Sequence, residues 1–270
     1  MAKPLRVGAV NYLNTKPLIE GLPELLPGSL LHLDLPSRLA DSMRAGEVDI
    51  GLIPVAEYFR AVDYGMIPGL GIVSHGPVRS VILCSRCPAS EIRTLAMDEG
   101  SRTSAALVRI LLEKKHHIRP QLIDFPIHAK EVPANADAVL LIGDRAMGVI
   151  PQGFCPIWDL GEIWHQETGL PFVYAVWATL PGVPIHQELV FAFHQAREFG
   201  RQRLHAISSR EAALLGFSQE VVANYLGKVI HYEVGEAEAV SMALFRSFLS
   251  VLDYGLYEKK VETCVGSLCV

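Results

Sequence analysis

The chain has no uninterrupted apolar run of the length that crosses a membrane, about 18 residues or more, although half of its 270 residues are hydrophobic. It also has no basic surplus, because 24 Lys and Arg stand against 29 Asp and Glu, for a formal net charge of -5. The N-terminus lacks the apolar core of a secretory signal. We therefore expect a cytoplasmic protein that binds neither membranes nor nucleic acid.

Cysteine is scarce, and its spacing is irregular. The five cysteines are an odd number, and the single C-x-x-C pair, Cys84 and Cys87, has no second pair at zinc-site spacing, because Cys264 and Cys269 lie near the C-terminus. No dinucleotide, P-loop or nucleophile-elbow motif is present. We therefore expect reduced thiols, no disulfide framework, no metal and no cofactor.

Apolar segments with the length of strands alternate with segments of helical periodicity, and helical patterns dominate after His186. The clearest strands are "LRVGAV", "DIGLIPV", "TLAMDEG", "DAVLLIGDRAM" and "PFVYAVWATL". This alternation predicts an α/β fold with mostly parallel sheets.

Two long predicted strands, near 78–85 and 171–179, could cross from one lobe to another. They predict a discontinuous lobe one, residues 1–84 with 181–270, and an inserted lobe two, residues 85–180. Ligands of such folds bind between the lobes, at the carboxyl ends of strands.

Three hydroxyl residues stand where a helix follows a strand, in "EGSRTSAAL": Ser101, Thr103 and Ser104. Because the first N–H groups of a helix lack intrahelical partners, hydroxyls beside them suit a carboxylate or phosphate. Capping of the helix by one hydroxyl is the alternative.

The opening loop, "VNYLNTKPL", is a second polar turn after a strand. Asn14 or Thr15 could cap the helix that begins near Pro17. The amide of Asn14 could equally bind a hydroxylated substrate. Both interpretations stay open on these residues alone.

The stretch "SHGPVRSVIL" places Ser80 just before an apolar strand at an expected crossing. Ser80 could face the cleft or bond to nearby backbone, and Arg79 then points the other way. His75 is a candidate general base, although loop histidines usually lie on the surface.

"LIGDRAM" ends a buried strand with Gly143, Asp144 and Arg145. A carboxylate and a guanidinium there could bind a ligand, or could pair with each other and hold the turn.

Six stretches occur together in an order that is specific. They are "GAVNYLNTKPLIEGL", "DIGLIPVAEYFR", "GIVSHGPVRSVIL", "LAMDEGSRTSAALVRILL", "LIGDRAM" and "WDLGEIWHQETGLPFVYAVWA". The chain closely resembles the chorismate dehydratases of the futalosine pathway to menaquinone, the MqnA family. The likeness is strong over about residues 6–180 and weaker beyond.

The resemblance implies a fold like that of type II periplasmic binding proteins, with a ligand cleft between two lobes. It implies a carbon–oxygen lyase that removes water from chorismate to give 3-[(1-carboxyvinyl)oxy]benzoate, without metal or organic cofactor. Asn14 and Ser80 then correspond to active-site residues, and Thr103 and Ser104 to binders of a substrate carboxylate. We add Ser101, Gly143 and Asp144 as expected substrate-binding residues.

No side chain stands out as the general base, so we hypothesise that the enolpyruvyl carboxylate of the substrate removes the proton. One alternative is a sibling enzyme resembling 1,4-dihydroxy-6-naphthoate synthase. That enzyme has an "IHEGR" pattern whose histidine is replaced here by Gly143. The other is a solute-binding protein without catalysis. The sequence makes no prediction of oligomeric state.

Overall fold

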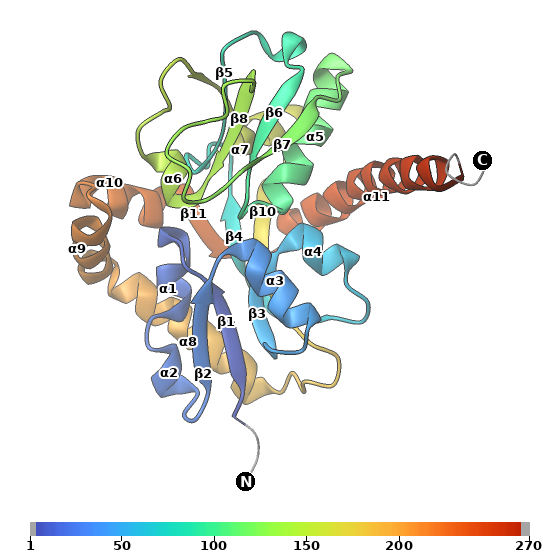
Figure 1. Ribbon diagram of the computed structural model, residues 1–270. Coiled ribbons are helices and arrows are strands. Elements are labelled where there is room, and N and C mark those ends of the chain that lie inside the picture. Colours follow the sequence, from blue (N-terminus) through green and yellow to red (C-terminus); the bar gives the residue numbers. More distant parts are fainter. Residues whose placement is uncertain (1–3, 266–270) are drawn as a thin grey trace.

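The computed structural model describes residues 4–265, and their side chains as far as Leu252. Two α/β lobes lie one above the other in Figure 1, each built around its own β-sheet. The first sheet has the order β11 (Ile230–Glu233), β4 (Gly65–Ser74), β10 (Phe172–Thr179), β3 (Ile50–Pro54), β1 (Arg6–Val10), β2 (Leu30–Asp34). The second has the order β7 (Gln121–Phe125), β6 (Thr94–Asp98), β8 (Ala138–Ile142), β5 (Val81–Ser85), β9 (Cys155–Asp159).

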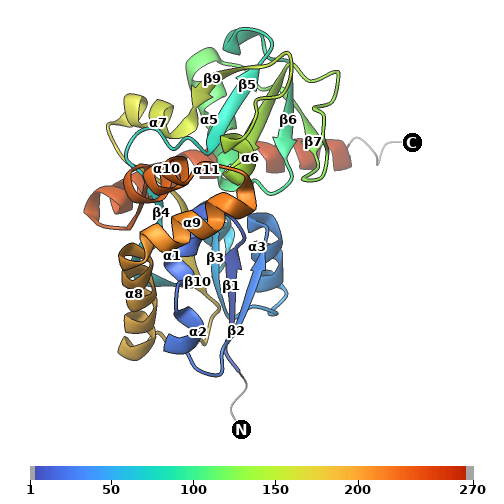
Figure 2. The same cartoon turned by 90° about the vertical axis from the view of Figure 1, so that its left-hand side faces the viewer.

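Helices surround both sheets (Figure 1, Figure 2). Those that flank or adjoin the first sheet are η1 (Leu13–Thr15), α1 (Lys16–Ile19), α2 (Leu22–Leu25), α3 (Pro36–Arg44), α4 (Val55–Arg60), α8 (Gln187–Gln202), α9 (Leu204–Leu215), α10 (Gln219–Asn224), the π-helical turn η3 (Tyr225–Val229) and α11 (Glu236–Val265). Those of the second lobe are η2 (Ala89–Glu91), α5 (Thr103–His116), α6 (Gly143–Met147) and α7 (Leu160–Thr168).

Both sheets are mixed, so the expectation of mostly parallel sheets is wrong. β1 pairs parallel with β2 and β3, and β6 pairs parallel with β7 and β8. β4, β5 and β10, however, pair antiparallel with all their neighbours. These strands carry the chain between the lobes, and a chain that leaves one lobe and returns enters each sheet against the direction of its βαβ strands.

The two expected crossing strands each belong to one sheet. β5 lies in the second sheet and β10 in the first, so the passages between the sheets fall in residues 75–80 and 160–171. The division into 1–84 with 181–270 and 85–180 stays a prediction, and sheet membership favours moving its two boundaries to those passages.

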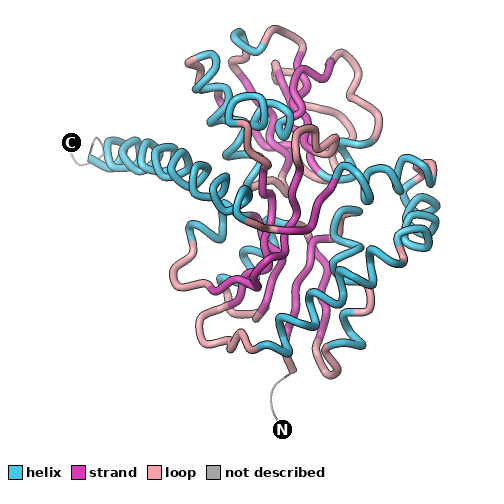
Figure 3. Tube along the Cα trace, turned by 180° about the vertical axis from the view of Figure 1, so that it is seen from behind, coloured by secondary structure: helices cyan, strands magenta, loops and turns pink. Residues whose placement is uncertain are grey.

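The C-terminal part contains a strand that the sequence did not predict. The stretch around "VIHYE" was expected to be helical, but Ile230–Glu233 forms β11 and pairs with β4. The local helical periodicity is overridden here because the open edge of β4 offers hydrogen-bond partners for the backbone of this stretch. After β11, α11 packs against β10, α4 and α5, then projects from the body of the protein (Figure 3).

Within the described residues, no helix is both long enough and apolar enough to pass through a bilayer.

Candidate active site

The first strand-to-helix turn brings Asn14 to the boundary between the lobes. The Leu13 N–H donates to Asp144 Oδ1 of the second lobe at 3.0 Å, which holds the turn in place. No side chain caps η1 or α1, so the capping interpretation of Asn14 and Thr15 is wrong. The half-buried Asn14 instead lines a cleft between the lobes.

Ser80 lies on the same cleft, at the passage from β4 to β5. The N–H groups of Val78 and Arg79 donate to the Asp159 carboxylate at 2.7 to 3.0 Å, and the Gly143 N–H donates to the Ser80 carbonyl at 2.8 Å. Ser80 is 1% exposed and Arg79 is exposed, so the two side chains point in opposite directions. This backbone is therefore fixed on both sides of Ser80.

The start of α5 supplies the hydroxyls expected for an anion. Ser101, Thr103 and Ser104 are all buried and line the cleft. No side chain caps α5, so the capping interpretation is wrong here too. Thr103 Oγ1 accepts the Ala56 N–H at 3.2 Å, whereas Ser101 Oγ is buried and has no partner among the described residues. An unpartnered buried hydroxyl beside helix N–H groups suits a carboxylate.

Tyr12 fills a slot between two glycines. A Cβ at Gly100 would lie 2.8 Å from the Tyr12 hydroxyl, and a Cβ at Gly143 would lie 2.8 Å from the ring. Burial, and next the charge of Asp98, raise the pKa of Tyr12, so its phenol stays protonated. Its buried hydroxyl has no partner in the described structure and borders the cleft, so it can donate to a ligand.

Asp144 and Arg145 do not pair with each other, so that interpretation is wrong. Asp144 accepts the Leu13 N–H, while Arg145 reaches Asp98 at 3.5 Å and lies 3.6 Å from the centre of the Phe125 ring. Gly143 lines the cleft and Asp144 does not. A substrate-binding role for Asp144 stays a prediction, and the structure places its carboxylate behind the Asn14 turn.

Other basic candidates lie outside the cleft. His75 pairs with Glu238 at 2.9 Å and lies against His231 in a tilted arrangement, with 4.4 Å between ring centres. Lys16 Nζ lies 3.8 Å from the Glu211 carboxylate. Neither basic side chain lines the cleft, which excludes His75 as a base acting there.

The cleft is partly open to solvent and is lined by residues of both sheets and of the turns beside them. Among the residues that line it in the described structure, Arg102 carries the single charge, and no Asp, Glu, His or Lys is present. The described residues contain no group of three or more His, Cys, Asp or Glu placed to hold a metal. Cys84, Cys87 and Cys155 are free thiols, while Cys264 and Cys269 lie outside the described side chains.

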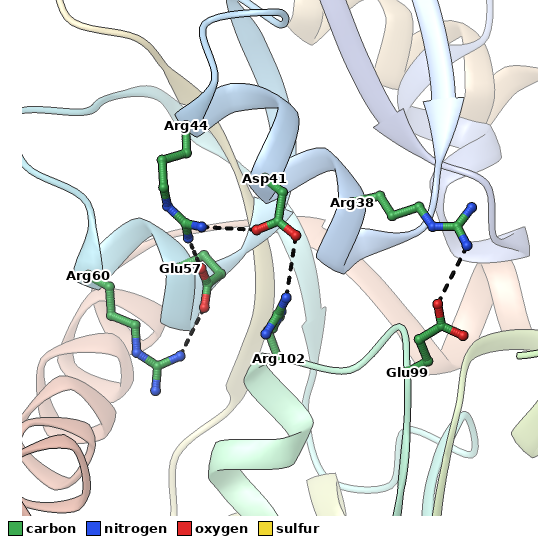
Figure 4. Close-up of polar contacts among 7 residues, drawn as sticks. All are labelled: Arg38, Asp41, Arg44, Glu57, Arg60, Glu99 and Arg102. Atoms are coloured by element: carbon green, nitrogen blue, oxygen red, sulfur yellow. Dashed lines mark hydrogen bonds and ion pairs between the residues drawn. The ribbon is translucent and has the colours of Figure 1, made fainter. Parts of the chain in front are cut away.

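Ion pairs connect the lobes beside the cleft (Figure 4). From the second lobe, Arg102 reaches Asp41 of α3 at 3.5 Å, and Glu99 reaches Arg38 of α3 at 3.5 Å. Asp41 also pairs with Arg44 at 3.0 Å. These side chains are partly exposed, so each pair is weak, but together they place the Arg102 guanidinium at the cleft edge.

Asp144 gives a testable dependence of stability on pH. Burial raises its pKa to about 6, against about 3.9 in an unfolded chain. The folded state then binds more protons between those values, so the contribution of Asp144 to stability is lost as pH rises from 4 to 6. Asp144→Asn keeps an acceptor for the Leu13 N–H. We expect its unfolding free energy, relative to wild type, to rise by about 1–3 kcal/mol over that range.

Urea unfolding at several pH values measures this difference. The control is Asp124→Asn, which changes an exposed carboxyl. A constant difference between Asp144→Asn and wild type from pH 4 to 6 would contradict the assignment.

Four residues of the site escaped the sequence analysis: Tyr12, Asp98, Asp159 and Tyr225. Tyr12 lies inside the quoted first loop, but nothing in that stretch indicates that its hydroxyl would be buried beside the cleft. Asp159 follows a strand and precedes a helix, where it accepts the Gly161 N–H at 3.0 Å, so a helix-cap search would have found it. Tyr225 lies in a helical stretch far along the chain, and no local signal indicates its position.

The fold and the site together define a class. Two α/β lobes, with passages between them and a cleft at their boundary, form a protein with the periplasmic-binding-protein-like fold. Solved structures agree in fold. A protein of Archaeoglobus fulgidus is 15% identical with a TM-score of 0.77 and covers 94% of this chain and 99% of its own. The periplasmic aliphatic sulphonate binding protein of Escherichia coli is 13% identical with a TM-score of 0.63, covering 97% and 89%.

The sequence comparisons are more specific. The profile of the family described as "Menaquinone biosynthesis" matches residues 5–250, and the chain belongs to this family. Chorismate dehydratase of Thermus thermophilus is 30% identical, covering 92% of this chain and 96% of its own length. Chorismate dehydratase of Campylobacter jejuni is 23% identical, covering 88% and 94%.

Proposed function

We propose that this protein is a cytoplasmic chorismate dehydratase, a carbon–oxygen lyase that removes water from chorismate to give 3-[(1-carboxyvinyl)oxy]benzoate for menaquinone. One observation carries the proposal. The cleft sets the hydroxyls of Tyr12 and Ser101, buried and without partners among the described residues, beside the start of α5, and no described carboxylate, imidazole or amine lines it. The relatives named chorismate dehydratase span nearly the whole chain.

The reaction depends on how the substrate is positioned more than on reactive protein side chains. The proton on the ring carbon that bears the enolpyruvyl ether is conjugated, through a double bond, to the ring carboxylate. When that C–H bond breaks, its electron pair delocalises through the double bond onto the ring carboxylate. The pair then forms the new ring double bond as the neighbouring C–O bond breaks. The hydroxide takes up a proton and leaves as water, and the ring becomes aromatic. The enzyme therefore has to hold the ring and stabilise charge on its carboxylate.

The start of α5 is the proposed site of the ring carboxylate. Ser101, Thr103 and Ser104 line the cleft, next to N–H groups that carry partial positive charge. Negative charge grows on this carboxylate as the proton leaves, so donors placed there stabilise the transition state more than the bound substrate.

Asn14 and Ser80 approach the cleft from other elements, at the first turn and at the passage to β5. The Asn14 amide has two N–H donors, and one of them is proposed to bind the departing hydroxyl. Because no carboxylate, imidazole or amine lines the described cleft, the enolpyruvyl carboxylate of chorismate itself is proposed to take the proton.

Arg102 is the proposed source of local attraction for chorismate, a dianion, in a protein whose net charge is negative. It is the charged residue of the described cleft lining, its side chain is 42% exposed, and its pair with Asp41 is long. We assign it to the second carboxylate of the substrate, for which it can exchange the Asp41 contact.

Arg102→Gln is expected to raise KM for chorismate by about tenfold, because one charge-assisted hydrogen bond is lost from a partly exposed site, while kcat changes less. Arg38→Gln is the matched control, since it removes the other ion pair between α3 and the second lobe without touching the cleft lining. Steady-state kinetics distinguish the two. Equal KM values for both variants would contradict the assignment.

The proposal as a whole is tested by incubating the purified protein with chorismate and following ultraviolet absorption and product mass. A product lighter by one water supports the dehydratase. Binding without turnover would overturn the proposal in favour of a solute-binding protein.

A further inference from the structure

Tyr225 lies behind the cleft and is hydrogen-bonded to the proposed catalytic residue Ser80. It belongs to η3, a π-helical turn that packs against η1. Its hydroxyl donates to Ser80 Oγ at 2.7 Å. Burial raises the pKa of this phenol, and the nearby Asn14 side chain partly offsets that rise. The ring is 2% exposed and does not line the cleft. A π-helical turn is a rare element that often marks a functional position.

The direction of these hydrogen bonds matters. Because Tyr225 donates to Ser80, the Ser80 hydroxyl cannot return its own proton along the same bond and is free to direct it to the cleft. Burial, the first cause, raises the pKa of Tyr225, so the phenol stays a donor at every ordinary pH. If Asn14 donates one N–H to the phenol oxygen, its second N–H remains for the substrate.

We propose that Tyr225 is a positioning residue that fixes the donor directions of Ser80 and Asn14 in one chain of hydrogen bonds, running from Asn14 through Tyr225 to Ser80. The chain connects the first turn, the passage between β4 and β5 and the C-terminal helical segment. It deepens the proposed function and rests on it. Tyr225 itself does not contact the reacting atoms.

The structure provides a matched control in Tyr232, seven residues on. Its hydroxyl is also buried and has no partner in the described structure, and Tyr232 is not among the residues that line the cleft. Tyr225→Phe and Tyr232→Phe both remove one buried hydroxyl and keep the ring, so packing losses are small in both.

Tyr225→Phe is expected to lower kcat for chorismate by about 10- to 100-fold with KM within about twofold, because the loss misplaces two donors without removing a substrate contact. Tyr232→Phe is expected to keep both constants. In a Ser80→Ala background, adding Tyr225→Phe is expected to lower kcat by less than about threefold further. The effect of Tyr225 that depends on Ser80 is already lost there, and such non-additivity marks residues that act together.

Three outcomes separate the claims. If wild type does not turn over chorismate, the proposed function fails. If wild type is active and Tyr225→Phe retains its kcat, the role of Tyr225 is overturned. A full additional loss from Tyr225→Phe in the Ser80→Ala background, with an unchanged thermal midpoint, would also overturn the proposed chain.

Discussion

Asn14→Ala is expected to lower kcat for chorismate by about 100- to 1,000-fold, the cost of removing one donor from a preorganised site. Asn14 lines the cleft, so truncation removes the donor proposed for the departing hydroxyl and the proposed link through Tyr225 to Ser80. The backbone of the turn should survive, because the bond from the Leu13 N–H to Asp144 does not involve the Asn14 side chain. KM should change little, since the carboxylate site at α5 is intact.

Asn11→Ala is the control for this variant. Asn11 belongs to the same loop, is exposed, and accepts a hydrogen bond from Lys16 Nζ at 3.2 Å outside the cleft lining. Near wild-type kinetics are expected for it. Retention of most activity by Asn14→Ala would show that Asn14 does not handle the leaving hydroxyl.

Gly143→Ala is expected to destabilise the protein by about 2–4 kcal/mol, as the sum of left-handed backbone strain and overpacking. Gly143 has φ +58°, and an added Cβ would lie 2.8 Å from the Tyr12 ring. Gly100 also lies against Tyr12, since a Cβ added there would lie 2.8 Å from the phenol oxygen, so the ring has little room to shift. Its displacement should also move the unpartnered phenol that borders the cleft, and chorismate turnover should fall with stability.

Gly153→Ala separates strain from packing. Gly153 has φ +80°, but nothing lies within 4 Å of a Cβ added there. Its loss should be limited to about 1–2 kcal/mol, with unchanged turnover. Urea unfolding of both variants measures the difference. Equal losses would mean that the Tyr12 slot adapts, against the account of Gly143.

The parts of the site that the sequence predicted are those where local chemistry and topology coincide. Asn14, Ser80 and the hydroxyls of Ser101 to Ser104 each follow or precede a strand, and strand ends of an α/β fold meet at the ligand edge. The structure brings them to one cleft. Capping, the competing explanation, failed because α1 and α5 begin without a side-chain cap.

The parts that could not be predicted depend on distant partners. Tyr225 contacts Ser80 across 145 positions of sequence, and nothing in "ANYLGKV" distinguishes it from a core tyrosine. The Arg145 guanidinium contacts the Phe125 ring and Asp98 instead of its sequence neighbour Asp144. These partners are distant in sequence, so the local pattern could not indicate them. β11 formed because β4 had an open edge, which a helical periodicity does not reveal.

The most direct test of the account is a crystal structure of Asn14→Ala with chorismate, in which slow turnover should retain the substrate. The account predicts chorismate in the cleft, its ring carboxylate on the hydroxyls of Ser101, Thr103 and Ser104, and its enolpyruvyl carboxylate within reach of both Arg102 and the ring proton. Chorismate bound with its ring carboxylate away from the start of α5, or with a protein base beside the ring proton, would contradict it.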